Sequence, residues 1–212
     1  MLKLIYAAQR NPKLSPSDFV RRWRQHGAFT MSLPNWEHAL TYVQALPLTR
    51  NKPAHIDAVA IYSAKDTLFD DTSSGGQDII KAIEADERET FLTQIPAVAM
   101  WVSEHVIKKG PFGGFGLYVF FNALADARAW LVNIDTNELG RVVLNVRSDI
   151  AYAAGDTSVT VIPSGLTYEA VVEVNSLNVS VLTALHDSTP VDQALCVLTQ
   201  EAPLWDASHK KS

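Results

Sequence analysis

One imidazole, His26, closes a short stripe of apolar residues that have helical spacing. Phe19, Trp23 and His26 are separated by four and then three positions, so in a helix they lie on one face. Because Phe19 and Trp23 favour burial against a core, we expect His26 to point inward beside them. A titratable group at the rim of an apolar compartment is typical of a site that moves protons on a small molecule. The alternative is a structural histidine that hydrogen-bonds a carbonyl group near the end of its helix.

A second stripe of the same geometry ends in a carboxylate. Ile79, Ile83 and Asp86 repeat the spacing of four and three, so Asp86 is expected near the same end of its helix layer as His26. The hypothesis is that Asp86 orients or charges His26 and that the pair is catalytic, suited to general acid–base work. The opposing interpretation is that Asp86 faces water together with the acidic residues around it, which are Glu84, Glu87 and Glu89.

Aromatic residues could form the walls of a ligand-binding compartment. Trp23 and Tyr6 are the preferred candidates, because one shares the face of His26 and the other lies on the first predicted strand. Tyr42 and Trp36 are the further candidates. Aromatic side chains also bury large areas without any ligand, so core packing is the competing explanation for each of them.

The sequence lacks the motifs that are typical of metal sites, phosphate-binding loops and serine nucleophiles. No HExxH or CxxC motif is present, which predicts no metal site. The glycines of residues 110–116 have no strand-loop-helix order around them, and no G-x-S-x-G occurs. Cys196 lies in an apolar strand and is expected to be a buried, inert thiol. One axial histidine suffices for haem, so His26 or His105 keeps a haem protein open as an alternative.

The helix that carries His26 is marked at both ends. Ser15 suits an N-cap, Pro16 suits the first helical position, and Asp18 completes a pattern similar to a capping box. Gly27 is predicted to end the helix, which would place His26 in its final turn.

The first half of the chain is predicted to alternate strands and helices in the order β-α-β-β-α-β, which is the ferredoxin-like pattern. The expected strands are 2–9, about 38–46, 56–63 and 98–107, and the expected helices are 15–26 and about 77–91, the latter after a loop over residues 70–76. In this pattern both helices cover one face of an antiparallel sheet.

The second half repeats this order more loosely. Its expected strands are 115–121, 141–146, 168–174 and 193–199, and its expected helices are 124–134 and 178–185. Two such halves, residues 1–110 and 111–212, could press their bare sheet faces together. The predicted fold class is therefore α+β, with tandem ferredoxin-like halves that form an α/β barrel within one chain. The first helix of the second half carries no imidazole, so only the first half is expected to hold a functional pocket.

The composition of the chain argues against some classes of binding partner. The chain has 212 residues, 19% of them charged, and a formal net charge of −5 without a basic run. This argues against nucleic acid or an anionic membrane surface as the main partner. The one cysteine precludes an intrachain disulfide. The first residues do not read as a signal peptide, and no apolar run is long enough to span a bilayer, so we expect a cytoplasmic protein.

Several short motifs in the first half make the sequence resemble the EthD family of the dimeric α/β-barrel superfamily. They are Met1-Leu-Lys-Leu-Ile-Tyr, Leu14-Ser15 and Phe19 before Trp23-Arg-Gln-His26, Tyr42-Val-Gln, Asp57-Ala-Val-Ala, Asp86-Glu followed by Phe91, and Ser103-Glu-His105-Val-Ile. Each is weak alone, but together and in order they cover residues 1 to 107. The resemblance implies a pocket between sheet and helices and a link to the breakdown of small organic compounds. Related barrels include cofactor-free monooxygenases, isomerases, lyases and haem enzymes.

The resulting expectation is an enzyme that needs no cofactor and acts on a small apolar or aromatic organic compound. His26 would donate or accept a proton, in an isomerase, lyase or monooxygenase type of reaction. The alternative is a non-catalytic ligand-binding or accessory protein of a catabolic pathway, and a third candidate is the haem protein. Whether the chain also forms a homodimer is left open.

Overall fold

The computed structural model describes residues 1–48, 55–66, 74–154, 158–190 and 194–207. In these residues eight strands form a closed antiparallel barrel in the order β1-β3-β2-β10-β5-β9-β6-β4, with helices packed outside it. The barrel strands are β1 (Leu2–Ala8), β2 (Ala39–Pro47), β3 (Ala58–Ala64), β4 (Ala99–Lys108), β5 (Gly114–Phe121), β6 (Val142–Arg147), β9 (Ala170–Ser176) and β10 (Ala194–Asp206). The α-helices are α1 (Pro16–Met31), α2 (Ser74–Thr90), α3 (Leu124–Asn133) and α4 (Val179–Ser188). The prediction of an α+β barrel with external helices is confirmed.

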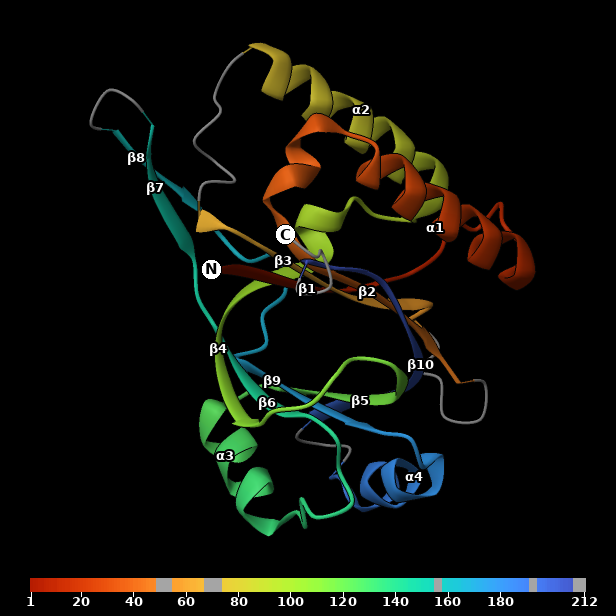
Figure 1. Cartoon of the computed structure of the whole chain (residues 1–212), viewed down its shortest axis with the longest axis vertical. Helices are drawn as coiled ribbons and strands as arrows, with labels where there is room; N and C mark the ends of the chain where they lie inside the picture. The colour runs from red at the N-terminus through yellow and green to blue at the C-terminus, as the bar shows by residue number, and fades with distance from the viewer. Residues whose placement is uncertain (49–54, 67–73, 155–157, 191–193, 208–212) are drawn as a thin grey trace.

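The two ends of the molecule in Figure 1 correspond to the two halves of the chain. The helices α1 and α2 lie together on one side of the barrel, and α3 and α4 lie on the opposite side. The sheet order is β4-β1-β3-β2 in the first half and β10-β5-β9-β6 in the second. The seams between the halves are the antiparallel pairs β10 with β2 and β4 with β6. Each half therefore contributes four consecutive barrel strands.

Strand alternation divides the apolar residues between two kinds of core. On β1, Ile5 and Ala7 face the barrel interior, where they belong to one cluster with Met100 from the first half and Phe120 from the second. The opposite face of β1, with Tyr6 and Ala8, packs beneath α1 and α2. A third cluster lies beneath α3 and α4. The inner face of α3 is apolar, because Ala127 is fully buried and Leu124, Leu131 and Ile134 pack on this cluster.

The start of α1 is confirmed, but its predicted end is wrong. The Ser15 hydroxyl accepts a hydrogen bond from the backbone N–H of Asp18 at 3.1 Å. The helix continues through Gly27 to Met31, and Ser32 is its C-cap. A Cβ atom at Gly27 would lie 2.9 Å from both Gln44 Nε2 on β2 and Leu204 Cδ1 on β10. This glycine therefore permits close packing of α1 on the barrel, and His26 lies inside the helix rather than in its last turn.

The remaining differences from the predicted elements are in the connections. A 3-10 helix η1 (Pro34–His38) precedes β2, and η4 (Ile95–Val98) precedes β4. A two-stranded hairpin of β7 (Ile150–Ala154) and β8 (Ser158–Ile162) projects from the barrel. It lies between β6 and β9 in the sequence and was not predicted. The expected loop over residues 70–76 falls partly outside the described residues, and α2 already begins at Ser74.

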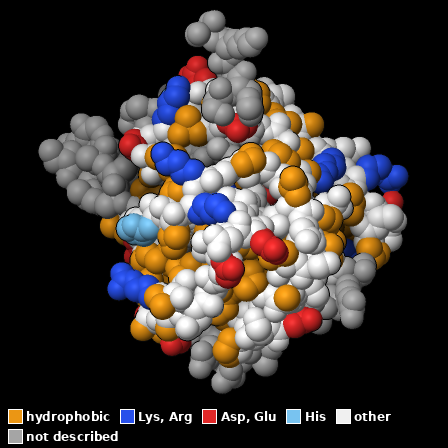
Figure 2. Space-filling model, turned by 60° about the horizontal axis from the view of Figure 1, so that its bottom comes forward, with side chains coloured by type: hydrophobic (Ala, Val, Ile, Leu, Met, Phe, Trp, Pro, Cys, Tyr) orange, Lys and Arg blue, Asp and Glu red, His pale blue; other side chains and the backbone are white. Residues whose placement is uncertain are grey.

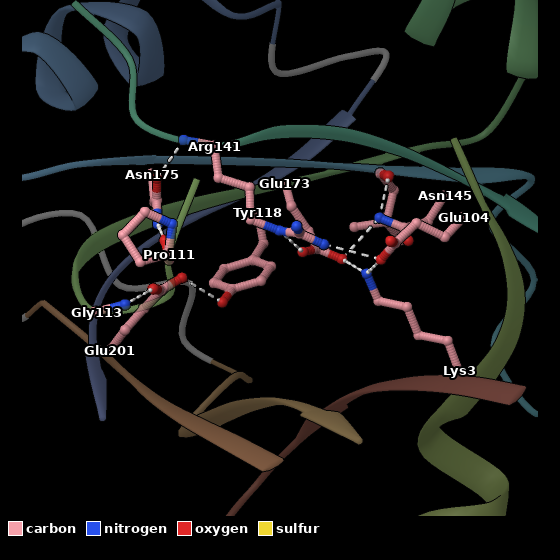
Figure 3. A network of polar contacts seen from close by, with 11 residues as sticks. Lys3, Glu104, Pro111, Gly113, Tyr118, Arg141, Asn145, Glu173, Asn175 and Glu201 are labelled. Atoms are coloured by element: carbon pink, nitrogen blue, oxygen red, sulfur yellow. Dashed lines mark hydrogen bonds and ion pairs between the residues drawn. The ribbon is translucent and has the colours of Figure 1, made fainter. Parts of the chain in front are cut away.

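One end of the barrel interior is polar, as Figure 3 shows. Lys3 is 2% exposed and forms ion pairs with Glu104, at 2.6 Å, and with Glu173. Arg141 contacts Glu104 at 2.9 Å, and Asn145 donates to Glu173. Burial alone would raise the pKa of Glu104, but the charges of Lys3 and Arg141 outweigh it and hold that pKa below its ordinary value. The network thus compensates charges that a dry barrel would otherwise exclude.

Candidate functional site

A cavity of about 210 Å³ lies between the α1–α2 pair and the outer face of the first four-stranded sheet. Its walls come from α1, η1, α2, η4 and the strands β1, β2 and β3. The residues that line it are Leu4, Tyr6, His26, Thr30, Trp36, Tyr42, Tyr62, Ile83, Glu87 and Ile95. Most of this surface is apolar or aromatic, so the hollow suits an organic molecule of about the size of one ring.

His26 reaches this cavity from the buried face of α1. The side chain is buried, and its ring stands edge-on to Phe91 with the centroids 5.6 Å apart. Its Nδ1 lies 2.6 Å from Oδ2 of Asp86 on α2. The other carboxylate oxygen of Asp86 accepts a hydrogen bond from Arg22 at 2.5 Å. The structure therefore brings together the histidine and the carboxylate that the two sequence stripes pair, in an Arg22–Asp86–His26 chain.

The hydrogen bond to Asp86 decides which ring nitrogen of His26 is free. A carboxylate only accepts hydrogen bonds, so Nδ1 carries the proton and Nε2 keeps its lone pair. Among the described residues Nε2 has no hydrogen-bond partner, and it is not one of the polar atoms sealed from solvent. Burial lowers the pKa of His26 below 6.5, although the hydrogen bond and the charge of Asp86 both act in the opposite direction. At neutral pH the ring is thus a neutral base that faces the cavity.

The hydroxyl groups of two tyrosines in the cavity wall each accept a hydrogen bond from a buried side chain. Trp23 Nε1 donates to the Tyr6 hydroxyl at 3.0 Å, and Gln44 Nε2 donates to the Tyr42 hydroxyl at 3.0 Å. Burial raises the pKa of both phenols, so their protons stay in place at neutral pH. The two phenols also interact with each other: the Tyr6 hydroxyl acts as donor toward Tyr42, which raises the pKa of Tyr6 and acts to lower that of Tyr42, so it is the Tyr42 hydroxyl that keeps a proton to donate. Trp23 itself is fully buried and is not among the lining residues; it positions Tyr6.

Trp36 on η1 closes one side of the cavity with a group of aromatic rings. Its ring lies 5.6 Å from Tyr42 and 5.7 Å from Tyr62, measured between centroids. The indole Nε1 is buried and has no hydrogen-bond partner in the described part of the chain. A buried unsatisfied donor costs about 1–3 kcal/mol. Because this atom is sealed from solvent, it is not a contact point for a ligand in the cavity.

Glu87 is the residue of this site that the sequence reasoning missed. It was expected to face water, but its side chain is 6% exposed and lines the cavity. Its Oε2 accepts a hydrogen bond from the backbone N–H of Ile95 at 3.1 Å. Burial raises the pKa of Glu87 to about 7. The signal was present in the sequence, because Glu87 follows Ile83 by four positions and so shares its helical face.

The other residues with chemical potential lie elsewhere. His105 is exposed on β4. Burial raises the pKa of Cys196 to about 11, so the thiol is not activated as a nucleophile. No group of three or more His, Cys, Asp or Glu side chains in the described residues could hold a metal ion. A larger groove of about 490 Å³ runs beside α4, but no histidine and no aromatic residue lines it.

Comparison with known proteins identifies the fold. No protein-family model matches the sequence, and no curated protein matches it. A structure titled "Putative monooxygenase" from Fusobacterium nucleatum subsp. nucleatum has a TM-score of 0.53 at 10% identity, over 96% of this chain and 92% of that one. A "putative monooxygenase" from Lactobacillus acidophilus has a TM-score of 0.48 at 12% identity, over 95% and 94% of the two chains. A mutant chlorite dismutase from Candidatus Nitrospira defluvii has a TM-score of 0.49 at 10% identity, over 96% and 92%.

At 10% identity the first of these matches shows a shared fold and nothing about the reaction. Two further observations concern the charges on the surface and the helices in the described residues. On the face in Figure 2, basic and acidic side chains are interspersed, without a continuous basic surface. None of the helices in the described residues combines the length and the apolar character needed to cross a bilayer.

Proposed function

We propose that the chain is an enzyme that acts, without a cofactor, on a small and largely apolar organic compound bound beneath α1 and α2. The observation that carries this proposal is the orientation of His26. Its Nδ1 is bound to Asp86, which leaves the lone pair of Nε2 available, and the side chain lines the cavity. His26 is the general base, and Asp86 holds it in the required tautomer and stabilises the imidazolium that forms.

The rest of the cavity defines the ligand. A volume of about 210 Å³ corresponds to about seven water molecules, which suits a single-ring compound. Tyr6, Tyr42 and Trp36 surround this space with aromatic surface, and the hydroxyl hydrogen of Tyr42 suits an oxygen acceptor on the ligand. The compound is therefore one ring or a short chain with at least one carbonyl or phenolic oxygen.

The proposal extends to the architecture and the family. The matching strand orders of the two halves support tandem ferredoxin-like units, over residues 1–110 and 111–212, of which only the first carries the site. The resemblance of residues 1–107 to the EthD family agrees with a role in the breakdown of small organic compounds. Homodimer formation belongs to the same proposal, since the resemblance to the EthD family implies the dimeric α/β-barrel superfamily.

A haem does not fit this site. A neutral His26 could offer Nε2 to iron, but the cavity is smaller than the roughly 300 Å³ at which pockets for drug-sized ligands begin. A haem is larger than such ligands. The exposed His105 is not among the residues that line the cavity.

A binding experiment tests the location of the site. The probes are phenol, cyclohexanone and acetophenone, and the readout is the change in tryptophan fluorescence on titration. Ile83→Trp fills the cavity from α2, whereas Ile80→Trp makes the same change at a position on α2 that is 56% exposed. We expect probe binding to the wild type and to Ile80→Trp, and at least tenfold weaker binding to Ile83→Trp. Equal binding to both variants, or no binding to the wild type, would refute the proposed site.

A second experiment separates catalysis from mere binding, which is the alternative function. In D₂O, a base at Nε2 exchanges the α-hydrogens of a bound ketone, and ¹H NMR follows this exchange. His26→Ala should lower the exchange rate by about 10²-fold or more while probe binding changes little. Binding without any exchange above the His26→Ala level would instead identify a ligand-binding protein.

A further inference from the structure

Glu87 gives the cavity a second proton-transfer group, whose carboxyl is arranged differently from that of Asp86. Asp86 uses its two oxygens to bind His26 and Arg22. Glu87 uses only Oε2, which accepts the backbone N–H of Ile95. No described residue hydrogen-bonds Oε1, and this atom is not sealed from solvent although the side chain is 6% exposed. Glu87 is therefore an anchored carboxyl with one oxygen unpaired among the described residues, and its side chain lines the same cavity as that of His26.

The two groups lie on different helices and suit opposite roles. His26, from α1, is neutral and accepts a proton. Glu87, from α2, has a pKa near 7 and keeps its proton over part of the neutral range, so it donates one. Pairs of titratable groups whose environments separate their pKa values are the usual acid and base of one reaction. Tyr42 adds a hydroxyl donor for a substrate oxygen.

We propose that Glu87 donates a proton to the substrate while His26 removes one, so that the site relocates a proton on an enolisable single-ring ketone. This rests on the proposed function, and it selects isomerisation from the reaction types considered there. A β,γ-unsaturated cyclic ketone is the simplest substrate of this class, and cyclohex-3-en-1-one fits the cavity as a single ring.

The bond changes balance without any co-reactant. His26 Nε2 takes a hydrogen from the carbon between the carbonyl and the double bond, so that C–H bond breaks and an N–H bond forms. The electron pair moves toward the carbonyl oxygen, which accepts the hydrogen bond of Tyr42. As the pair returns, the far alkene carbon takes the proton from Glu87, and the conjugated ketone results. Exchange with solvent protons returns His26 and Glu87 to their starting states.

The pH dependence of this reaction follows from the two groups and from the charges around them. Isomerisation requires His26 without its second proton and Glu87 with its proton, so the rate should fall above a pH of about 7. The titratable and charged groups near Glu87 are Glu84, Asp86 and Arg88 on α2, His26 on α1, and Tyr6, Tyr42 and Tyr62 on the strands.

The test compares two reactions of one probe, cyclohex-3-en-1-one, in the full chain. Isomerisation to cyclohex-2-en-1-one is followed by ultraviolet absorption, and exchange of its α-hydrogens in D₂O is followed by ¹H NMR. Glu87→Gln retains an acceptor for the Ile95 N–H but cannot donate a carboxyl proton. We expect it to lower kcat for isomerisation by about 10²-fold or more, with exchange changed only a few-fold because that step needs His26 alone.

Two further variants serve as controls. Glu84→Gln makes the same chemical change on α2 outside the cavity lining and should keep both rates close to those of the wild type, with the alkaline fall moved slightly to lower pH because the charge of Glu84 raises the pKa of Glu87. Glu87→Asp restores a carboxyl and should recover part of the isomerisation together with the fall in rate above pH 7. Isomerisation by Glu87→Gln at the wild-type rate, or the same alkaline fall in that variant, would overturn the role of Glu87 and leave the proposed function intact. If the wild type catalysed neither reaction above the His26→Ala level, the proposed function would fail and this inference with it.

Discussion

Replacing Glu87 by Gln should make the protein more stable at alkaline pH, although it removes a residue of the candidate site. Burial raises the pKa of Glu87 in the folded chain from its ordinary 4.5 to about 7. The folded state therefore keeps this proton to a higher pH than the unfolded chain does, and stability falls as the pH rises between these two values. A tenfold change in proton affinity is worth about 1.4 kcal/mol, so the full loss is about 3 kcal/mol.

Glutamine cannot ionise, and its amide oxygen can still accept the N–H of Ile95. The difference in free energy of unfolding between the variant and the wild type at pH 4 serves as the baseline, because Glu87 carries its proton there. At pH 8 this difference should have moved in favour of the variant by about 3 kcal/mol. Urea unfolding at several pH values measures this difference, and the titrations of other groups cancel in it. Glu84→Gln provides the matched control and should show a much smaller pH-dependent difference. A Glu87→Gln difference that does not grow with pH would refute the burial argument.

Three further predictions concern packing, the barrel interior and the histidine. Gly27→Ala should lower the free energy of unfolding by about 1–3 kcal/mol in urea titrations, because the added Cβ meets Gln44 and Leu204 at 2.9 Å; a stabilisation, as expected for alanine in an unhindered helix, would contradict this reading. Lys3→Met should lower the free energy of unfolding by about 3–5 kcal/mol in the same titrations, since it removes the positive charge that pairs with Glu104 and Glu173 inside the barrel. A decrease below 1 kcal/mol would show that Arg141 alone balances these two carboxylates. Asp86→Asn should lower the pKa of His26 further, because the hydrogen bond and the charge of Asp86 both raise it; NMR titration of the imidazole would disprove the coupling if that pKa stayed unchanged.

Several features of the first half of the chain could be predicted, because the spacing of apolar residues indicates which side chains share one face of a helix. The spacing of Phe19, Trp23 and His26 was enough to place the imidazole on the buried side of α1, where the structure has it. The same argument applied to Ile83 and Asp86 pointed to the contact of Asp86 with His26. Ser15 and Pro16 located the start of α1, because a helix N-terminus needs local side-chain acceptors.

Periodicity could not decide between two adjacent carboxylates. Asp86 and Glu87 lie about 100° apart around α2, within the width of one buried face. Which of them binds a partner and which enters the cavity depends on Arg22, His26 and the backbone of Ile95, all supplied by other elements. The burial of Glu87 is thus a tertiary property, and so is its raised pKa.

The sequence by itself determined the order of the barrel strands and the α-helices, the inward face of α1 and the candidate pair of His26 and Asp86, since these depend on local spacing and capping. Only the tertiary structure decided that α1 passes through Gly27, that β10 runs on to pair with β2 and close the barrel, and that Glu87 shares the cavity with His26. The physical reason is that each of these features depends on contacts between segments far apart in the chain, whose close approach no local pattern records.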